Sequence, residues 1–545
     1  MAAASAAVVA VATLALRAQP TEPAQLLVRA NVGLPAVVEG AIQDETHAPN
    51  TPEAARRASM QRALRPDGIG SSGVPYVRGR LIVKFKDGMS DAARASALRS
   101  ASGSATDSGK PDYADFNMVT LDPSEDSEAI AALLSERSDV EYAQPAYRVH
   151  TFFVPNDEFY KPSARFPPGQ WDLPLIGMES AWDIQPQAGS SITVAIVDSG
   201  LAYMNATVTA TLHAFRGDNG ALYPALGTVT IPYSAATQLV APGRIVAPRD
   251  FIWTNPAQSL ALDFSGHGTH VAGTIGQITN DGVGTAGIAF NVKLMPVKVI
   301  NETWDDIFGS PNAATDDVVA RGVRYAADNG ANIINMSIGR EGPPNTAPAV
   351  EDAIRYAVSR GAFVVISAGN SFEDGNPRQV IAEIASRVQG AVSVAAIDRS
   401  ATAGDHKCTG SSASPSCHAY YSSSGPWVEL SAPGGSERGF GRDGLIWQQT
   451  FDFNFTDTYL LPPGEYRPPR FDVLATVGYI GTSMAAPHVS GLAAMVMQQG
   501  IKDPAAIEAA LEKFAVDLGT PGRDDLYGYG MIDARATLRG LGIAR

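Results

Sequence analysis

Cysteine is nearly absent from this chain of 545 residues, which has only Cys408 and Cys417. The two lie in a Gly/Ser-rich stretch and lack the neighbouring cysteines and histidines that a zinc site needs. The pair therefore gives no support to a zinc centre. In an exported protein we expect them to form one small-loop disulfide, and in a cytosolic protein we expect two free thiols.

Basic residues are too few to indicate nucleic-acid binding. The chain has 41 Lys and Arg against 56 Asp and Glu, a formal net charge of −15, and no basic stripe along the sequence. Such a chain does not present the positive surface that attracts phosphate backbones. We therefore expect no nucleic-acid partner and interpret the acidic surplus as a solvated surface.

Long apolar runs are scarce as well. The run at residues 2–16 is too short to span a bilayer comfortably, and no other run is long enough, so we expect no membrane span. The run resembles the apolar core of a signal peptide, although no Lys or Arg precedes it. We expect residues 1–18 to be a signal peptide and the protein to be secreted.

Two segments of different character follow this run. Residues 19–77 are rich in Ala, Pro, Thr, Ser and Gly without a sustained period, which predicts a disordered leader. Residues 78–150 have the pattern of a compact β-α-β-α-β unit. The strands are expected at 80–85, 116–121 and 140–149, and the helices at 91–100 and 126–136. On its residues alone, this unit is an ordinary small α/β domain.

Residues 481–491 (GTSMAAPHVSG) predict a tight turn that runs into a buried helix. Ser483 falls at the start of this helix, where Ser is a favoured N-cap, and for a lone Ser that interpretation is the simpler one. However, small residues flank Ser483 and the helix is apolar nearly all round, so the hydroxyl would be accessible and rigidly held. A Ser hydroxyl becomes a nucleophile only beside a base that an acid orients.

Two further stretches supply such a base and acid. Residues 192–200 (ITVAIVDSG) predict a buried strand with Asp198 at its C-terminal end, where α/β sheets bind ligands. Residues 263–273 (DFSGHGTHVAG) place His267 between two glycines at the start of a small-residue helix. Each residue alone has a structural explanation, as a turn or helix-start residue. Together with Ser483 they indicate a catalytic set.

These three stretches resemble the signature blocks of the subtilisin-like serine proteases. Their order, Asp then His then Ser, is the order of that family and differs from that of chymotrypsin-like enzymes and α/β-hydrolases. The resemblance covers about residue 80 to the end. It implies a serine endopeptidase that acts on polypeptides through Asp198, His267 and Ser483. It also implies that Asn370, otherwise an Asx-turn residue, donates to the oxyanion.

The remaining organisation agrees with this resemblance. Strands and helices alternate over residues 151–545, which predicts an α/β catalytic domain with a three-layer parallel sheet covered by helices on both faces. The unit at 78–150 resembles the family's inhibitory propeptide, which implies a self-processing zymogen, cut near His150, with its own propeptide as intramolecular inhibitor. Residues 203–249 and 438–470 are predicted to be surface insertions.

The resemblance also implies contacts with substrate. Ser337, Ile338 and Gly339 match the family's substrate-binding strand, which holds the peptide as an added extended strand. Ala368 and Gly369 would line the pocket for the residue before the cut. Because these side chains are small, we expect an open pocket that accepts large apolar side chains.

Calcium is one of two interpretations of residues 279–285 (TNDGVGT). This loop resembles the family's structural calcium loop, and Asp281 and Asp157 would then contribute to the six to eight oxygens that the ion needs. The alternative is a Gly-rich turn. We interpret His270 and His488 as helix residues and not as metal ligands. We expect no cofactor for catalysis, and a monomer.

Two other functions are compatible with the same residues. One is a catalytically silent pseudo-protease that binds peptides, and the other is an esterase that uses the same triad. The complete triad argues against the first. The propeptide-like unit and the peptide-binding strand argue against the second.

Overall fold

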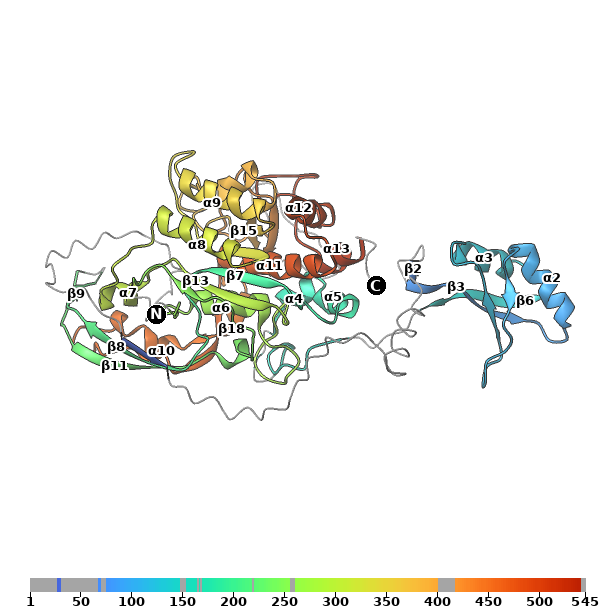
Figure 1. Cartoon of the computed structure of the whole chain (residues 1–545), viewed down its shortest axis with the longest axis horizontal. Coiled ribbons are helices and arrows are strands. Elements are labelled where there is room, and N and C mark those ends of the chain that lie inside the picture. The colour runs from blue at the N-terminus through green and yellow to red at the C-terminus, as the bar shows by residue number, and fades with distance from the viewer. Residues whose placement is uncertain are drawn as a thin grey trace. The chain divides into compact units, whose positions relative to one another are not determined.

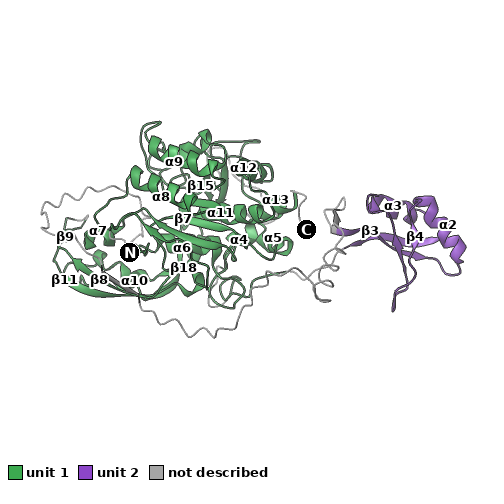
Figure 2. Cartoon of the chain, in the orientation of Figure 1, with its two compact units in different colours: residues 1–33, 152–544 green, residues 34–151, 545 purple. Residues whose placement is uncertain are grey.

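The chain forms two compact units, one of residues 34–151 with 545 and the other of residues 1–33 with 152–544 (Figure 2). The computed structural model describes residues 27–30, 67–69, 75–147, 153–163, 166, 169–217, 220–254, 260–399 and 417–540. The predicted signal peptide and the predicted cut near His150 lie outside these residues. Within the described part, no helix is both long and apolar enough to cross a membrane.

The smaller unit is an antiparallel sheet with two helices. Its strands follow the order β2-β3-β5-β4, and β6 also pairs with β3. The strands are β2 (Asp67–Ile69), β3 (Pro75–Phe85), β4 (Thr106–Asp107), β5 (Asn117–Thr120) and β6 (Val140–Tyr147), and the helices are α2 (Asp91–Ala101) and α3 (Ser127–Ser135). Side-chain oxygens of Ser90 and Asp126 cap the two helices. The predicted β-α-β-α-β unit is thus present, with β2 and β4 added.

Two strands lie inside the stretch predicted as a disordered leader. β1 (Leu27–Ala30) pairs antiparallel with β8 of the larger unit, and β2 pairs with β3. The prediction therefore fails at these two segments. A strand of three or four residues carries almost no periodic signal, because the partner that provides its hydrogen bonds is distant in sequence.

A seven-stranded parallel sheet is the centre of the larger unit (Figure 1). In spatial order its strands are β12 (Arg249–Asp250), β13 (Lys293–Lys298), β7 (Thr193–Asp198), β14 (Ile333–Met336), β15 (Phe363–Ser367), β16 (Ala391–Ile397) and β17 (Leu430–Pro433). Helices α6 (His267–Gly276) and α11 (Thr482–Gln498) cover one face, and α8 (Asp316–Asp328) and α9 (Pro348–Ser359) cover the other. The predicted three-layer α/β fold is confirmed.

The other elements surround this sheet. The helices are α4 (Asp172–Leu175), α5 (Met178–Ile184), α7 (Thr303–Phe308), α10 (Phe453–Thr456), α12 (Pro504–Lys513) and α13 (Ala534–Gly540), with 3-10 turns η1 (Thr237–Leu239), η2 (Ala382–Arg387), η3 (Gly441–Gly444) and η4 (Thr458–Leu460). The strands are β8 (Ala206–Leu212), β9 (Phe215–Arg216), β10 (Leu222–Tyr223), β11 (Gly227–Tyr233), β18 (Ile446–Phe451) and β19 (Leu474–Tyr479).

The two stretches predicted as surface insertions pack against each other. Tyr223 OH donates to Leu461 O at 2.9 Å, and the rings of Tyr223 and Tyr466 are in contact. Tyr233, Phe451 and Phe471 are almost fully buried and their rings are in contact. The insertions therefore extend the core, which corrects the expectation that they lie only on the surface.

The strand ends bring the predicted site residues together. Asp198 is the last residue of β7, Ser337 directly follows β14, and Ala368 directly follows β15. These three strands are neighbours and parallel, so their carboxyl ends meet at one edge of the sheet. Ligands of open α/β sheets bind at this edge.

Candidate active site

His267 and Asp198 form the most direct contact of the site. His267 Nδ1 lies 2.7 Å from Asp198 Oδ1, and Ser199 donates its backbone N–H to the same oxygen at 2.7 Å. The Asp198 side chain is 1% exposed, whereas that of His267 is 26% exposed. A buried carboxylate thus holds one ring nitrogen of an imidazole that is partly exposed. This is the arrangement of a general base.

The carboxylate of Asp263 fixes both members of this pair. Its Oδ1 accepts hydrogen bonds from Ser265 N, Gly266 N and Ser199 Oγ, and its Oδ2 accepts from the backbone and hydroxyl of Thr269. Because Ser199 follows Asp198 and Thr269 lies in the first turn of α6, this fully buried carboxylate joins the strand end to the helix start. Two N–H groups in the first turn of α6 are paired in this way, that of Thr269 with Asp263 and that of Gly268 with Ser199 Oγ.

Neighbouring charges shift the pKa of His267. Burial acts to lower it, but the charge of Asp198 and its hydrogen bond, followed by Glu302 and Asp263, outweigh burial and raise the pKa to about 9. Burial in turn raises the pKa of Glu302 to about 7. The charge of His267 acts to lower this pKa, and the charge of Asp198 acts to raise it. The imidazolium form is therefore favoured more strongly here than in water.

Ser483 lies in the first turn of α11, whose N-cap is Gly481. This corrects the simpler interpretation of Ser483 as the cap itself. Ser483 Oγ donates to Ser337 O at 3.2 Å, and Ser337 Oγ donates to Ser483 O at 2.8 Å. Behind them, Ser490 Oγ donates to Asn335 Oδ1 at 2.8 Å. The helix that carries Ser483 is thus hydrogen-bonded both to Asn335 of β14 and to Ser337, the residue that follows β14.

Asn370 directs its amide toward the same turn. Its Oδ1 accepts hydrogen bonds from Thr482 N at 2.9 Å and Thr482 Oγ1 at 2.8 Å. Thr482 Oγ1 also accepts a hydrogen bond from Gly369 N at 3.1 Å. With Oδ1 held in this way, the orientation of the side chain is fixed and Nδ2 remains as a donor.

The predicted substrate segments lie close together, with an unpredicted side chain against both. Gly369 has φ +103, and a Cβ built at that residue would lie 2.5 Å from Cδ of Gln379. A Cβ at Gly339 would lie 3.8 Å from Oε1 of Gln379, which is 4% exposed. The space between the two segments is therefore lined by a buried polar side chain. This side chain is not among those that the sequence predicts to line the pocket.

The candidate calcium residues are also close in space. Asp157 Oδ2 accepts the backbone N–H of Asn280 at 2.7 Å, whereas its Oδ1 is buried with no hydrogen-bond partner. Burial raises the pKa of Asp157 to about 6, and the nearby charge of Asp281 adds to this effect. Gln238 Nε2 donates to Asp281 Oδ2 at 3.2 Å. An unpaired buried carboxylate oxygen near a second carboxylate fits a hard cation.

The two other histidines near the sequence motifs, His270 and His488, have structural partners. His270 Nε2 lies 3.1 Å from both Ile446 O and Val477 O, and its ring stacks on Tyr479. Burial lowers the pKa of His270 to about 3, so the ring is neutral. His488 is held by Asp172 and by its own helix. Across the described residues, no cluster of three or more His, Cys, Asp or Glu side chains suits a metal.

Sequence reasoning missed four contributors to the site: Asp263, Thr482, Glu302 and Gln379. Asp263 had a local signal, because an acidic residue shortly before a helix start is typical of an N-terminal cap. The roles of Glu302 and Gln379 depend on contacts between distant segments, which a local pattern does not report. Cys417 is disulfide-bonded, and the other cysteine of the sequence, Cys408, lies outside the described residues.

Known families match both units of the chain. Residues 189–530 match the Subtilase family, Peptidase_S8. Residues 69–146 match the Fervidolysin N-terminal prodomain.

Individual relatives match most of the chain. A thermophilic serine proteinase from Bacillus sp. (strain AK1) is 26% identical over 83% of this chain and 86% of its own length. Fervidolysin from Fervidobacterium pennivorans is 28% identical over 74% of this chain, which spans half of that relative. Among solved structures, a protease from Pseudoalteromonas arctica matches 71% of this chain and 99% of its own, with 25% identity and a TM-score of 0.48.

The family match covers more than half of the chain, including the whole region that contains the His267–Asp198 pair, Asn370 and Ser483. The chain belongs to the subtilase family of serine endopeptidases and carries an N-terminal prodomain of the fervidolysin type.

Proposed function

We propose that the protein hydrolyses peptide bonds through an acyl-enzyme on Ser483. Ser483 Oγ attacks the substrate carbonyl, and His267 accepts the proton and returns it to the leaving amine. Asp198 holds the imidazole tautomer and stabilises the imidazolium. The 2.7 Å contact between His267 Nδ1 and Asp198 Oδ1 carries this proposal. For this step the Ser483 hydroxyl would leave Ser337 O, to which it donates in the structure, and donate to His267 Nε2 instead.

The oxyanion would be stabilised by two fixed donors. Thr482 holds Asn370 Oδ1, so that Nδ2 is available, and the backbone N–H of Ser483 lies in the first turn of α11, where it has no carbonyl one turn earlier in the helix to pair with. Donors fixed before the reaction stabilise developing charge without reorganisation. Loss of one such donor typically raises the barrier by about 2.7–4 kcal/mol.

We also propose that the smaller unit inhibits the larger one and is removed by self-processing near His150. The match of residues 69–146 to a prodomain supports this. Secretion is proposed with it, because the disulfide of Cys417 is typical of oxidising compartments.

Self-processing can be tested by intact mass of the purified full chain beside Ser483→Ala, each with and without a fluorophosphonate probe. We expect the unsubstituted chain to lose the segment before about His150 and to take up one probe. Ser483→Ala should stay full length and unlabelled, because it lacks the nucleophile. A full-length, unlabelled parent that stays unlabelled after another protease nicks the prodomain would favour a silent peptide-binding protein. Labelling with turnover of esters but not of proteins would favour an esterase.

The pKa of His267 sets the expected pH dependence. His267 must be neutral to accept the Ser483 proton, and its pKa is raised to about 9, so kcat/KM should rise with pH through that value. Glu302→Gln removes a negative charge that raises this pKa, so the rising limb should shift to lower pH. The exposed Glu465→Gln serves as control. If the rising limb of kcat/KM in Glu302→Gln stays at the same pH, Glu302 does not raise the pKa of His267.

The side chain of Gln379 should set the preference for the residue before the cut. Because it lies against Gly339 and Gly369, it should disfavour large apolar side chains there. Gln379→Gly should raise kcat/KM for Phe relative to Ala at that position by about tenfold or more. A series of peptide substrates that differ only at this residue measures the ratio. An unchanged ratio would place the pocket elsewhere.

Calcium would be held by Asp157 and Asp281 with backbone carbonyls of their loop, and when bound it would supply a positive charge that stabilises this fold. Binding to the native state adds about 2.7 kcal/mol when the free ion exceeds Kd a hundredfold. A chelator should therefore lower the Tm of Ser483→Ala, read by tryptophan fluorescence, and Ca²⁺ should restore it. In a protein that also carries Asp157→Asn, the Tm should be the same with chelator and with Ca²⁺. An equal chelator effect in Asp157→Asn would exclude this site.

A further inference from the structure

Arg244 is a buried cation with no acidic partner among the described residues. Its side chain lies in the segment between η1 and β13 and is 7% exposed. Both Nε and Nη2 are fully buried and have no hydrogen-bond partner. Burial lowers the pKa of Arg244 to about 10, and no described acidic group contributes to the shift. The guanidinium is therefore charged at neutral pH and lacks a counter-ion among the described residues.

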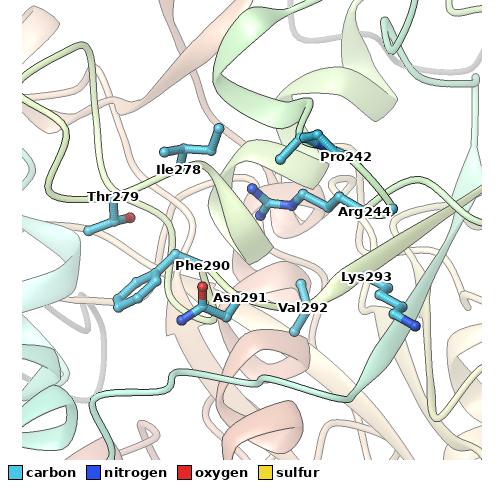
Figure 3. Close-up of a pocket in the computed structure, with 10 residues that line it drawn as sticks. Pro242, Arg244, Ile278, Thr279, Phe290, Asn291, Val292 and Lys293 are labelled. Carbon is cyan, nitrogen blue, oxygen red and sulfur yellow. The ribbon is translucent and has the colours of Figure 1, made fainter. Parts of the chain in front are cut away.

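The guanidinium borders a pocket of about 460 Å³. Figure 3 shows the Arg244 side chain extending between Ile278 on one side and Phe290 and Val292 on the other. Lys293 lies at the rim and is exposed. The pocket therefore combines one buried cation, one exposed cation and several apolar walls.

The end of helix α6 does not satisfy this arginine. Nη2 lies 3.0 Å from the position of a Cβ at Gly276, the last residue of the helix, so the helix dipole favours a cation here. However, the last-turn carbonyls already accept backbone hydrogen bonds: Thr274 O from Ile288 N, and Ile275 O from Ala289 N. A buried charge without hydrogen bonds carries a large desolvation penalty that the dipole only partly offsets.

We propose that this pocket binds the carboxylate of a small organic acid. The planar guanidinium matches a carboxylate in a bidentate pair, and the carboxylate would supply the counter-charge that Arg244 lacks among the described residues. The volume is within the range of small-molecule sites and exceeds the needs of an inorganic ion. Ile278, Phe290 and Val292 provide contact for the apolar body of the acid, and Lys293 adds charge at the entrance.

The test uses 3-phenylpropionate and isothermal titration calorimetry at fixed ionic strength. The protein is full-chain Ser483→Ala, which removes self-digestion. We expect saturable binding, at least tenfold weaker binding after Arg244→Met, and at least tenfold weaker binding of the neutral amide of the same acid. Arg216→Met, a substitution of an exposed arginine, should leave the affinity unchanged. Binding in the substrate site would not respond to Arg244→Met and is thereby distinguished.

Lys293→Glu provides a second variant on the exposed rim, where folding is not at risk. Its carboxylate competes for Arg244, so binding should again weaken at least tenfold. Absence of saturable binding to the parent, or equal affinity in Arg244→Met or Lys293→Glu, would overturn the proposal. If sulfate binds with the same affinity as 3-phenylpropionate, the pocket is a site for inorganic oxoanions, and the proposal of an organic acid is wrong.

Discussion

One buried carboxylate, that of Asp263, determines how the two halves of the catalytic pair meet. It accepts hydrogen bonds from Ser199 beside Asp198 and from Gly266 and Thr269 at the start of α6. A carboxylate with several fixed donors is stable inside the protein only while those donors stay in place. The strand end and the helix start therefore have one relative position, and the 2.7 Å contact of His267 with Asp198 follows from it.

The insertions reinforce the same helix from outside the sheet. Tyr233 OH donates to the backbone carbonyl of Asp263 and accepts a hydrogen bond from its backbone N–H, which connects β11 to the residue that carries this carboxylate. Thr450 Oγ1 on β18 donates to Gly266 O, and His270 of α6 stacks on Tyr479 of β19. The helix that carries His267 is thus enclosed by strands that the sheet itself does not require. The insertions contribute to the rigidity of the active site as well as to the core.

Charge burial gives the two ends of α6 different properties. At its first residue, His267 is charged more readily than in water because Asp198 and Glu302 outweigh desolvation. At its last residue, Arg244 is desolvated without any described acidic partner. The charge of His267 is balanced within the chain, whereas the charge of Arg244 would be balanced by the proposed external anion. This contrast is the physical basis for assigning a catalytic site to one end and a ligand pocket to the other.

The sequence by itself determined the parallel sheet, its covering helices and the positions of Asp198, His267 and Ser483. Strand and helix periods are local, and each of these residues ends or begins an element that its neighbours specify. Only the tertiary structure decided that Gln379 borders Gly369, that Glu302 acts on His267, that parts of the insertions are buried, and that Arg244 has no acidic partner among the described residues. These features depend on which distant segments come into contact and on how much water that contact excludes. Neither can be predicted from a local sequence pattern.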